Sequence, residues 1–143
     1  MSERVMSETR GPNILRSLGA VVAGLLTIFV LHLGTDVVMH ATGIFPPWFQ
    51  PMAGPLWVFA LAYRSVYSVL GCYITARLAP NNPMKHAMLL GVIGVVLSIA
   101  AVASTWNAGP EYGPKWFSIL LVASSLPCAW LGGKLGERGK RGA

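Results

Sequence analysis

Four long runs of apolar residues divide the chain, and charged or turn-forming residues separate them. The runs cover about residues 17–41, 56–78, 87–105 and 116–135. A helix needs roughly 20 apolar residues to cross the hydrocarbon core of a bilayer. Because backbone groups in lipid must be satisfied within the segment, each run predicts a membrane-spanning α-helix. A cleaved signal peptide is the alternative for the first run, but no convincing small-x-small cleavage site follows it.

Proline and glycine punctuate the three connections between these runs. The connections lie at residues 43–55, 80–83 and 107–114. Proline lacks the N–H that a helix interior needs, so the first and third connections cannot continue a helix. Such short connections place consecutive helices side by side and antiparallel. The sequence predicts one all-α membrane domain over residues 1–143, an antiparallel four-helix bundle with flexible tails at 1–13 and 137–143.

Lysine and arginine are distributed unequally between the two sides of this predicted bundle. Nine of the 11 lie in the tails or beside the second connection, whereas Lys115 lies on the other side and Arg64 lies within a span. Cytoplasmic loops carry the excess of positive charge, so both termini are expected in the cytoplasm. Tryptophan agrees, because indole rings favour the headgroup level. Four of the five tryptophans fall at the opposite helix ends: Trp48, Trp57, Trp106 and Trp116.

Composition supports the membrane assignment. The chain is 54% hydrophobic and 11% charged, against about 25% charged residues in a typical soluble domain. The net charge of +6 does not indicate nucleic-acid binding, because the basic residues gather at helix ends and in tails instead of on one face. They suit anionic lipid headgroups, so the expected partner is the bilayer. Cys72 and Cys128 show no metal-ligand spacing and are expected to be buried thiols.

Two charged residues inside the predicted spans need an explanation, since a charge in the bilayer is costly. At the helical rise per residue, Asp36 lies about 8 Å and Arg64 about 12 Å below the outer helix ends. Antiparallel neighbours therefore bring them to similar depth, and a guanidinium can meet a carboxylate through two hydrogen bonds. We expect an Asp36–Arg64 ion pair. Three roles stay open for these charges: a structural tie, a proton or substrate site, or separate snorkelling to the headgroups.

His32, Asp36 and His40 recur every four residues and so share one stripe of the first helix. The two histidines are about 12 Å apart along the axis, too far to share one metal ion. Zinc would need further ligands from another helix, and haem would need axial ligands at matched depth. We therefore expect neither a metal nor another cofactor, and we expect His32 or His40 to hydrogen bond to Asp36.

Small residues four apart mark places where helices can approach closely. The pairs are Ala20 and Gly24, Gly94 and Ser98, and Gly132 and Gly136. They predict tight helix packing and leave a homo-oligomer open.

Several segments also carry a resemblance to known proteins. They are residues 34–43 (GTDVVMHATG), 46–48, 62–67, 75–80, 105–107 and 127–133. In these segments the chain resembles a group of small bacterial four-span membrane proteins with no assigned activity. The resemblance covers most of the chain outside the tails. It implies a multi-pass protein of the bacterial inner membrane and implies no mechanism.

Two classes of function follow. The first is a small non-enzymatic membrane protein, a structural or accessory subunit, because four packed spans leave little room for an aqueous path. The alternative is an oligomeric transporter or channel subunit with a polar site in the outer half. That site would draw on His32, Asp36, His40, Tyr63, Arg64 and Tyr67. Exposure separates the two, since a transport site must be wet and partly unpaired. An enzyme acting on lipid or quinone is the third possibility, with Asp36 and His40 as its candidates.

Overall fold

The computed structural model describes residues 2–142, with side chains described from residue 13 onward. Four α-helices are present: α1 (Ser2–Ala41), α2 (Gly54–Leu78), α3 (Pro83–Thr105) and α4 (Lys115–Arg141). A short 3-10 helix, η1 (Pro110–Tyr112), precedes α4. All four α-helices are long and apolar enough to cross a membrane. The predicted all-α fold with four helices of spanning length is confirmed.

Proline and glycine set the helix ends, as the sequence pattern predicts. Pro55 lies in the first turn of α2, and Pro83 is the first residue of α3. Gly113, with φ 95°, turns the chain into Pro114, which caps the start of α4. Only glycine adopts such a φ readily, because it has no Cβ.

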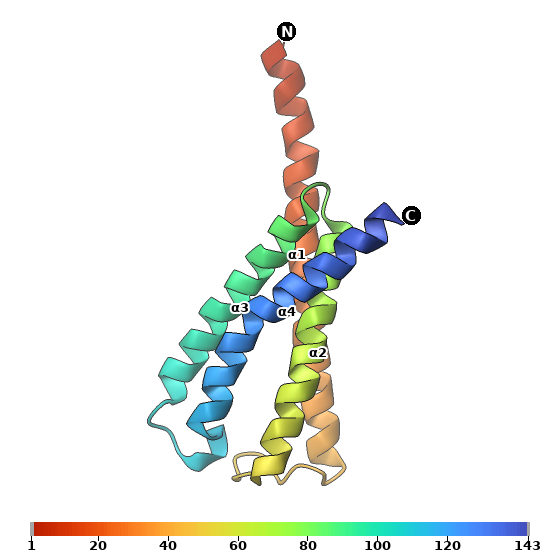
Figure 1. The fold of residues 1–143 in the computed structure, drawn as a ribbon. Coiled ribbons are helices and arrows are strands. Elements are labelled where there is room, and N and C mark those ends of the chain that lie inside the picture. The colour runs from red at the N-terminus through yellow and green to blue at the C-terminus, as the bar shows by residue number, and fades with distance from the viewer. Residues whose placement is uncertain (1, 143) are drawn as a thin grey trace.

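All four helices are longer than the predicted spans, α1 and α4 by the most residues. Helix α1 begins at Ser2 instead of near residue 17, and α4 continues to Arg141 instead of ending near residue 135. Both extensions run into segments that the sequence predicts as tails, and their flexibility stays a prediction. In Figure 1 the start of α1 projects beyond the other helices.

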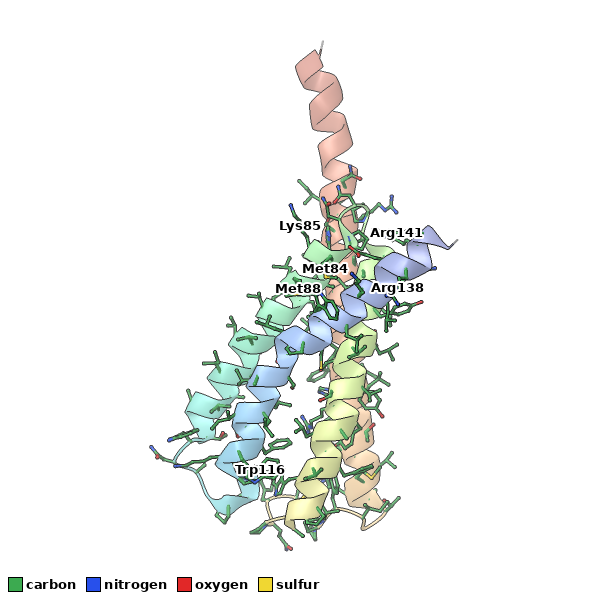
Figure 2. The ribbon with its side chains drawn as sticks, in the orientation of Figure 1. Met84, Lys85, Met88, Trp116, Arg138 and Arg141 are labelled. Carbon is green, nitrogen blue, oxygen red and sulfur yellow. The ribbon has the colours of Figure 1, made fainter. Side chains whose placement is uncertain are left out.

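The chain reverses direction at each connection, so the molecule has two distinct ends (Figure 1). The basic end holds both termini and the α2–α3 turn, with Lys85, Arg138 and Arg141 (Figure 2). The aromatic end holds the other two connections, with Trp48, Trp57, Trp106 and Trp116 at or beside them. Helix α2 contacts the other three helices, α4 packs on α2 and α3, and α1 packs mainly on α2.

Near the basic end the helices pack at distances that only glycine permits. A Cβ added to Gly24 of α1 would lie 2.6 Å from the Gly71 carbonyl oxygen and 2.8 Å from Leu90 Cδ2. Gly132 and Gly136 of α4 lie equally close to α2. The small-residue faces containing Gly24, Gly132 and Gly136 are therefore used within one chain. A homo-oligomer would need another surface.

Two polar contacts join helices in this half. The Thr75 hydroxyl, fully buried, donates across the α1–α2 interface to the Ala20 carbonyl at 2.9 Å. Lys140, in the last turn of α4, donates to the carbonyl of Ala79. These contacts anchor α1 and the end of α4 to α2 and to the turn that follows it.

Candidate functional site

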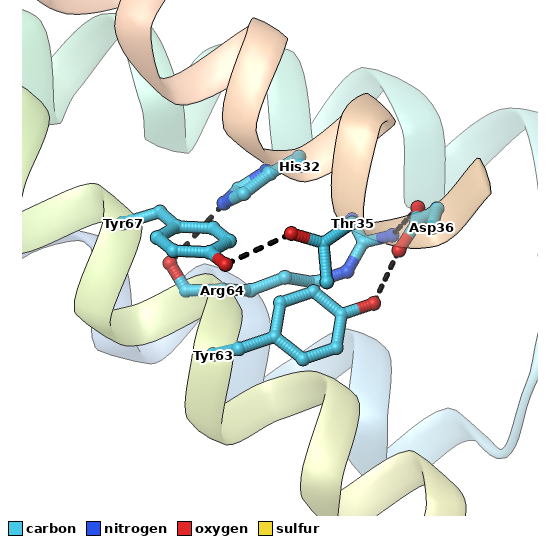
Figure 3. Close-up of polar contacts among 6 residues, drawn as sticks. All are labelled: His32, Thr35, Asp36, Tyr63, Arg64 and Tyr67. Carbon is cyan, nitrogen blue, oxygen red and sulfur yellow. Dashed lines mark hydrogen bonds and ion pairs between the residues drawn. The ribbon is translucent and has the colours of Figure 1, made fainter. Parts of the chain in front are cut away.

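The two intramembrane charges meet between α1 and α2. Arg64 Nη2 forms an ion pair with Asp36 Oδ2, and the Tyr63 hydroxyl donates to Asp36 Oδ1 (Figure 3). Each carboxylate oxygen therefore has its own donor from α2. The contact expected from the depths of Asp36 and Arg64 is present, and its role stays a prediction.

Two further contacts extend this arrangement along the same helix pair. The Thr35 and Tyr67 hydroxyls lie 2.8 Å apart, and His32 Nε2 donates to the Arg64 carbonyl at 3.2 Å (Figure 3). We call these six residues the polar network: His32, Thr35, Asp36, Tyr63, Arg64 and Tyr67. The Thr35–Tyr67 pair adjoins the rest through the Tyr67 ring, which lies beside the rings of His32 and Tyr63. Thr35 is the member that the sequence analysis missed. Its position beside Asp36 was the only signal, and a threonine in a span is too common to stand out.

The histidines do not hydrogen bond to Asp36, and this corrects the sequence-based expectation. His32 bonds to a backbone carbonyl of α2, and His40 Nδ1 donates to the Pro46 carbonyl at 2.6 Å. The His40 ring stacks on Trp48 with centroids 3.7 Å apart. Residues four apart lie about 6 Å from each other along a helix, and donors from α2 already occupy the Asp36 oxygens. His40 therefore organises the α1–α2 connection and stands outside the polar network.

The ion pair is neither fully buried nor fully saturated. The side chains of Asp36 and Arg64 are 17% and 25% exposed. Arg64 Nε is buried and has no hydrogen-bond partner among the described residues. A buried donor without a partner is unfavourable unless water or a ligand satisfies it. The carboxylate of this pair is satisfied, whereas the guanidinium has a donor to spare.

A cavity of about 470 Å³ lies between the four helices, and we call it the interhelical cavity. Apolar side chains such as Leu25, Ile28 and Leu97 form much of its wall. Its polar lining consists of His32, Asp36, Arg64, Ser65, Ser68, Ser98, Ser124 and Ser125. In Figure 1 the α3–α4 hairpin diverges from α1 and α2 toward the aromatic end. Mostly apolar walls with a few polar groups are typical of small-molecule sites.

A second cavity of about 290 Å³ lies at the aromatic end, and we call it the vestibule. The end of α1, the α1–α2 connection, the first turns of α2, η1 and α4 form its wall. Its aromatic and acidic lining consists of Asp36, Phe45, Trp48, Phe49, Trp57, Tyr63, Glu111, Tyr112 and Phe117.

Asp36 and Arg64 are the two residues that line both cavities. The ion pair therefore stands at the boundary between the vestibule and the interhelical cavity. A change in this pair would alter the wall of both spaces at once.

Other candidate chemistry in the described part of the chain is limited. Cys72 and Cys128 are buried free thiols. Among residues 13–142, no three His, Cys, Asp or Glu side chains gather as metal ligands. Comparisons with protein-family models, with curated proteins and with solved structures found no match to this chain. The geometry of the polar network and its two cavities is therefore the basis for a functional proposal.

Proposed function

We propose that this chain is a non-enzymatic solute-binding or transport subunit of the bacterial inner membrane. In this proposal its helices form an antiparallel four-helix bundle with both termini in the cytoplasm, and the vestibule opens outward. A small solute enters the vestibule and reaches the interhelical cavity past the Asp36–Arg64 pair. The pair acts as a gate, because its opening would join the two spaces.

The observation that carries this proposal is the position of the ion pair between two cavities. A charge pair that only ties two helices together needs no open space beside it, and the attraction between its charges is strongest where water is excluded. Asp36 and Arg64 instead remain partly exposed and face cavities on two sides. The unpartnered Nε of Arg64 also leaves a donor for water or solute.

A structural or accessory role is the second candidate, and one contact favours it. Both Asp36 oxygens accept hydrogen bonds, one from Tyr63 and one from Arg64. A carboxylate satisfied in this way fixes the register of α1 against α2 without any solute. The two candidates differ in whether the interhelical cavity contains water, and this difference is measurable.

Cysteine accessibility provides the test. In a chain whose two native cysteines are changed to alanine, Ser98→Cys places a thiol on the wall of the interhelical cavity. Its neighbour Ile99 does not line either cavity, is 53% exposed, and faces lipid in this proposal, so Ile99→Cys is a control at the same depth. We expect a membrane-impermeant methanethiosulfonate, added outside spheroplasts, to label Ser98→Cys and not Ile99→Cys. Methanethiosulfonates react with the ionised thiol, which needs water.

Opening the gate should raise the labelling rate. Asp36→Asn removes the charge that holds Arg64, so we expect faster labelling of Ser98→Cys in that background. If neither thiol reacts in any background, the cavity is dry and the structural role replaces this proposal. Equal labelling of both thiols would contradict the assignment of Ile99 to the lipid-facing surface.

A further inference from the structure

The vestibule gathers an unusual share of the aromatic residues. Seven of the chain's 14 Phe, Trp and Tyr residues line this one space. Phe45, Tyr63 and Phe117 are buried there, whereas Trp48, Phe49 and Tyr112 are exposed. Aromatic residues at a membrane interface normally lie at the headgroup level, so their gathering around one open space calls for a separate explanation.

Neighbouring rings hold several of these side chains in place. Trp57 of α2 lies against Phe117 of α4, with ring centroids 4.8 Å apart and planes inclined by 54°. Trp48 is stacked on the His40 ring, which is itself held by the Pro46 carbonyl. Rings fixed in this way can present π faces to a ligand without losing further side-chain entropy on binding.

Counted with a neutral His40, the charges around the vestibule sum to a negative value. Asp36, Glu111, Arg64 and His40 line it. Arg64 is paired with Asp36, whereas Glu111 forms no ion pair with any residue in the range 13–142. Lys115 lies near Glu111 in sequence, but its ammonium sits over the Trp106 ring at 4.5 Å. One carboxylate therefore remains uncompensated beside the aromatic walls.

We infer that the vestibule binds an organic cation of the quaternary ammonium type. Aromatic faces attract such a cation through their quadrupoles, and quaternary ammonium groups are the ligands that aromatic cages recognise. The group has no N–H to satisfy, so it needs no directed hydrogen bond from the wall. An anion would meet Glu111, and among residues 13–142 no three His, Cys, Asp or Glu side chains gather as metal ligands. The inference deepens the proposed function and rests on it only for the outward orientation of the vestibule.

Choline is the probe for this inference, and its uncharged carbon isostere 3,3-dimethylbutan-1-ol is the matched control ligand. The full-length chain is purified in dodecyl maltoside and placed in phosphatidylglycerol nanodiscs, so that no other quaternary ammonium is present. Binding of radiolabelled choline is measured by scintillation proximity. We expect tetramethylammonium to displace the label and the neutral isostere to leave it bound.

Variants assign the binding to the vestibule. Trp57→Leu keeps an apolar side chain but removes the ring, and we expect about tenfold weaker choline binding. Trp57→Phe restores a ring and should recover most of the affinity, which separates lost recognition from misfolding. Glu111→Gln should weaken binding by a smaller factor. Trp116→Leu is the control, since Trp116 lies at the same end and does not line the vestibule.

The lipid composition of the discs shows whether the bound cation is a lipid headgroup or a free solute. If discs of phosphatidylcholine abolish binding of free choline, the lipid headgroup occupies the site, and if they do not, the ligand is a free solute. The inference is wrong if the wild-type chain binds no choline, if the neutral isostere competes equally, or if Trp57→Leu and Glu111→Gln both bind as wild type. Choline binding without labelling of Ser98→Cys would keep the site and reject the gated passage. Labelling of Ser98→Cys without choline binding would keep the gated passage and reject the choline site.

Discussion

The two halves of the molecule are built on opposite packing rules. In the half near the basic end, which we call the clamp, glycines at positions 24, 71, 132 and 136 let helix backbones come into contact. In the half near the aromatic end, the polar network joins α1 to α2, the α3–α4 hairpin diverges from them (Figure 1), and two cavities lie between the helices. One set of four helices therefore combines close packing at one end with open space at the other. Close packing at one end holds the helices together while they separate at the other.

The largest effect is expected from a methyl group placed in the clamp. In Gly24→Ala the new Cβ would meet the Gly71 carbonyl at 2.6 Å, so the α1 backbone must shift. Overpacking of this kind costs about 3 kcal/mol of unfolding free energy. Gly34→Ala, ten residues along the same helix, is the control, because nothing lies within 4 Å of the added Cβ. Unfolding in mixed detergent micelles measures both, and equal stability of the two variants would refute the clamp.

A smaller effect is expected at the ion pair. Asp36→Ala or Arg64→Ala leaves one charge without its partner in a partly exposed site, and we expect each to lose about 2 kcal/mol. The double variant should lose less than the sum, giving a coupling free energy of about 1 kcal/mol or more. Asp36→Ala combined with Arg77→Ala is the control cycle, since Arg77 lies at the other end of α2. Additive losses in the Asp36–Arg64 cycle would mean that the pair is not coupled in the fold.

The smallest losses of stability are expected when one interhelical hydrogen bond is removed from either half. Thr75→Val removes a fully buried donor to Ala20 and should cost about 1 kcal/mol. Tyr67→Phe removes the partly buried contact to Thr35 and should cost about 0.5 kcal/mol. Thermal unfolding in detergent measures both, with Thr105→Val as the control because its hydroxyl bonds only within α3. A larger loss for Tyr67→Phe would show that the network near the aromatic end is the more rigid region.

Much of the candidate site follows from sequence reasoning about depth. Asp36 and Arg64 are charges in apolar runs that connect through one loop, so antiparallel helices place them at similar heights. Tyr63 and Tyr67 follow as neighbours of Arg64. The partners of the histidines do not follow, because His40 bonds to a loop carbonyl at Pro46. Loop backbone conformation depends on contacts that residue types alone do not specify.

The small-residue pattern is similarly incomplete. Spacing of four residues identifies Gly24 and Gly132 as points of close approach, but it does not say which helix approaches. Both pack against α2, which makes α2 the centre of the molecule. Gly71, the counterpart of Gly24 on α2, also has a small residue four positions away, Thr75, but the sequence analysis did not single out this pair.

The sequence by itself determined the number and type of the helices and their ends at the three connections, but not the start of α1 or the end of α4. In a bilayer, a long apolar run has no alternative to helix, because its backbone must hydrogen bond within itself. Proline and glycine then mark the ends through purely local effects. Only the tertiary structure decided which face of each helix meets which neighbour. Rotation about a helix axis changes no local hydrogen bond, so it is set by contacts between residues far apart in the chain. The position of the ion pair between two cavities depends on that rotation, and so does the gathering of aromatic residues around the vestibule.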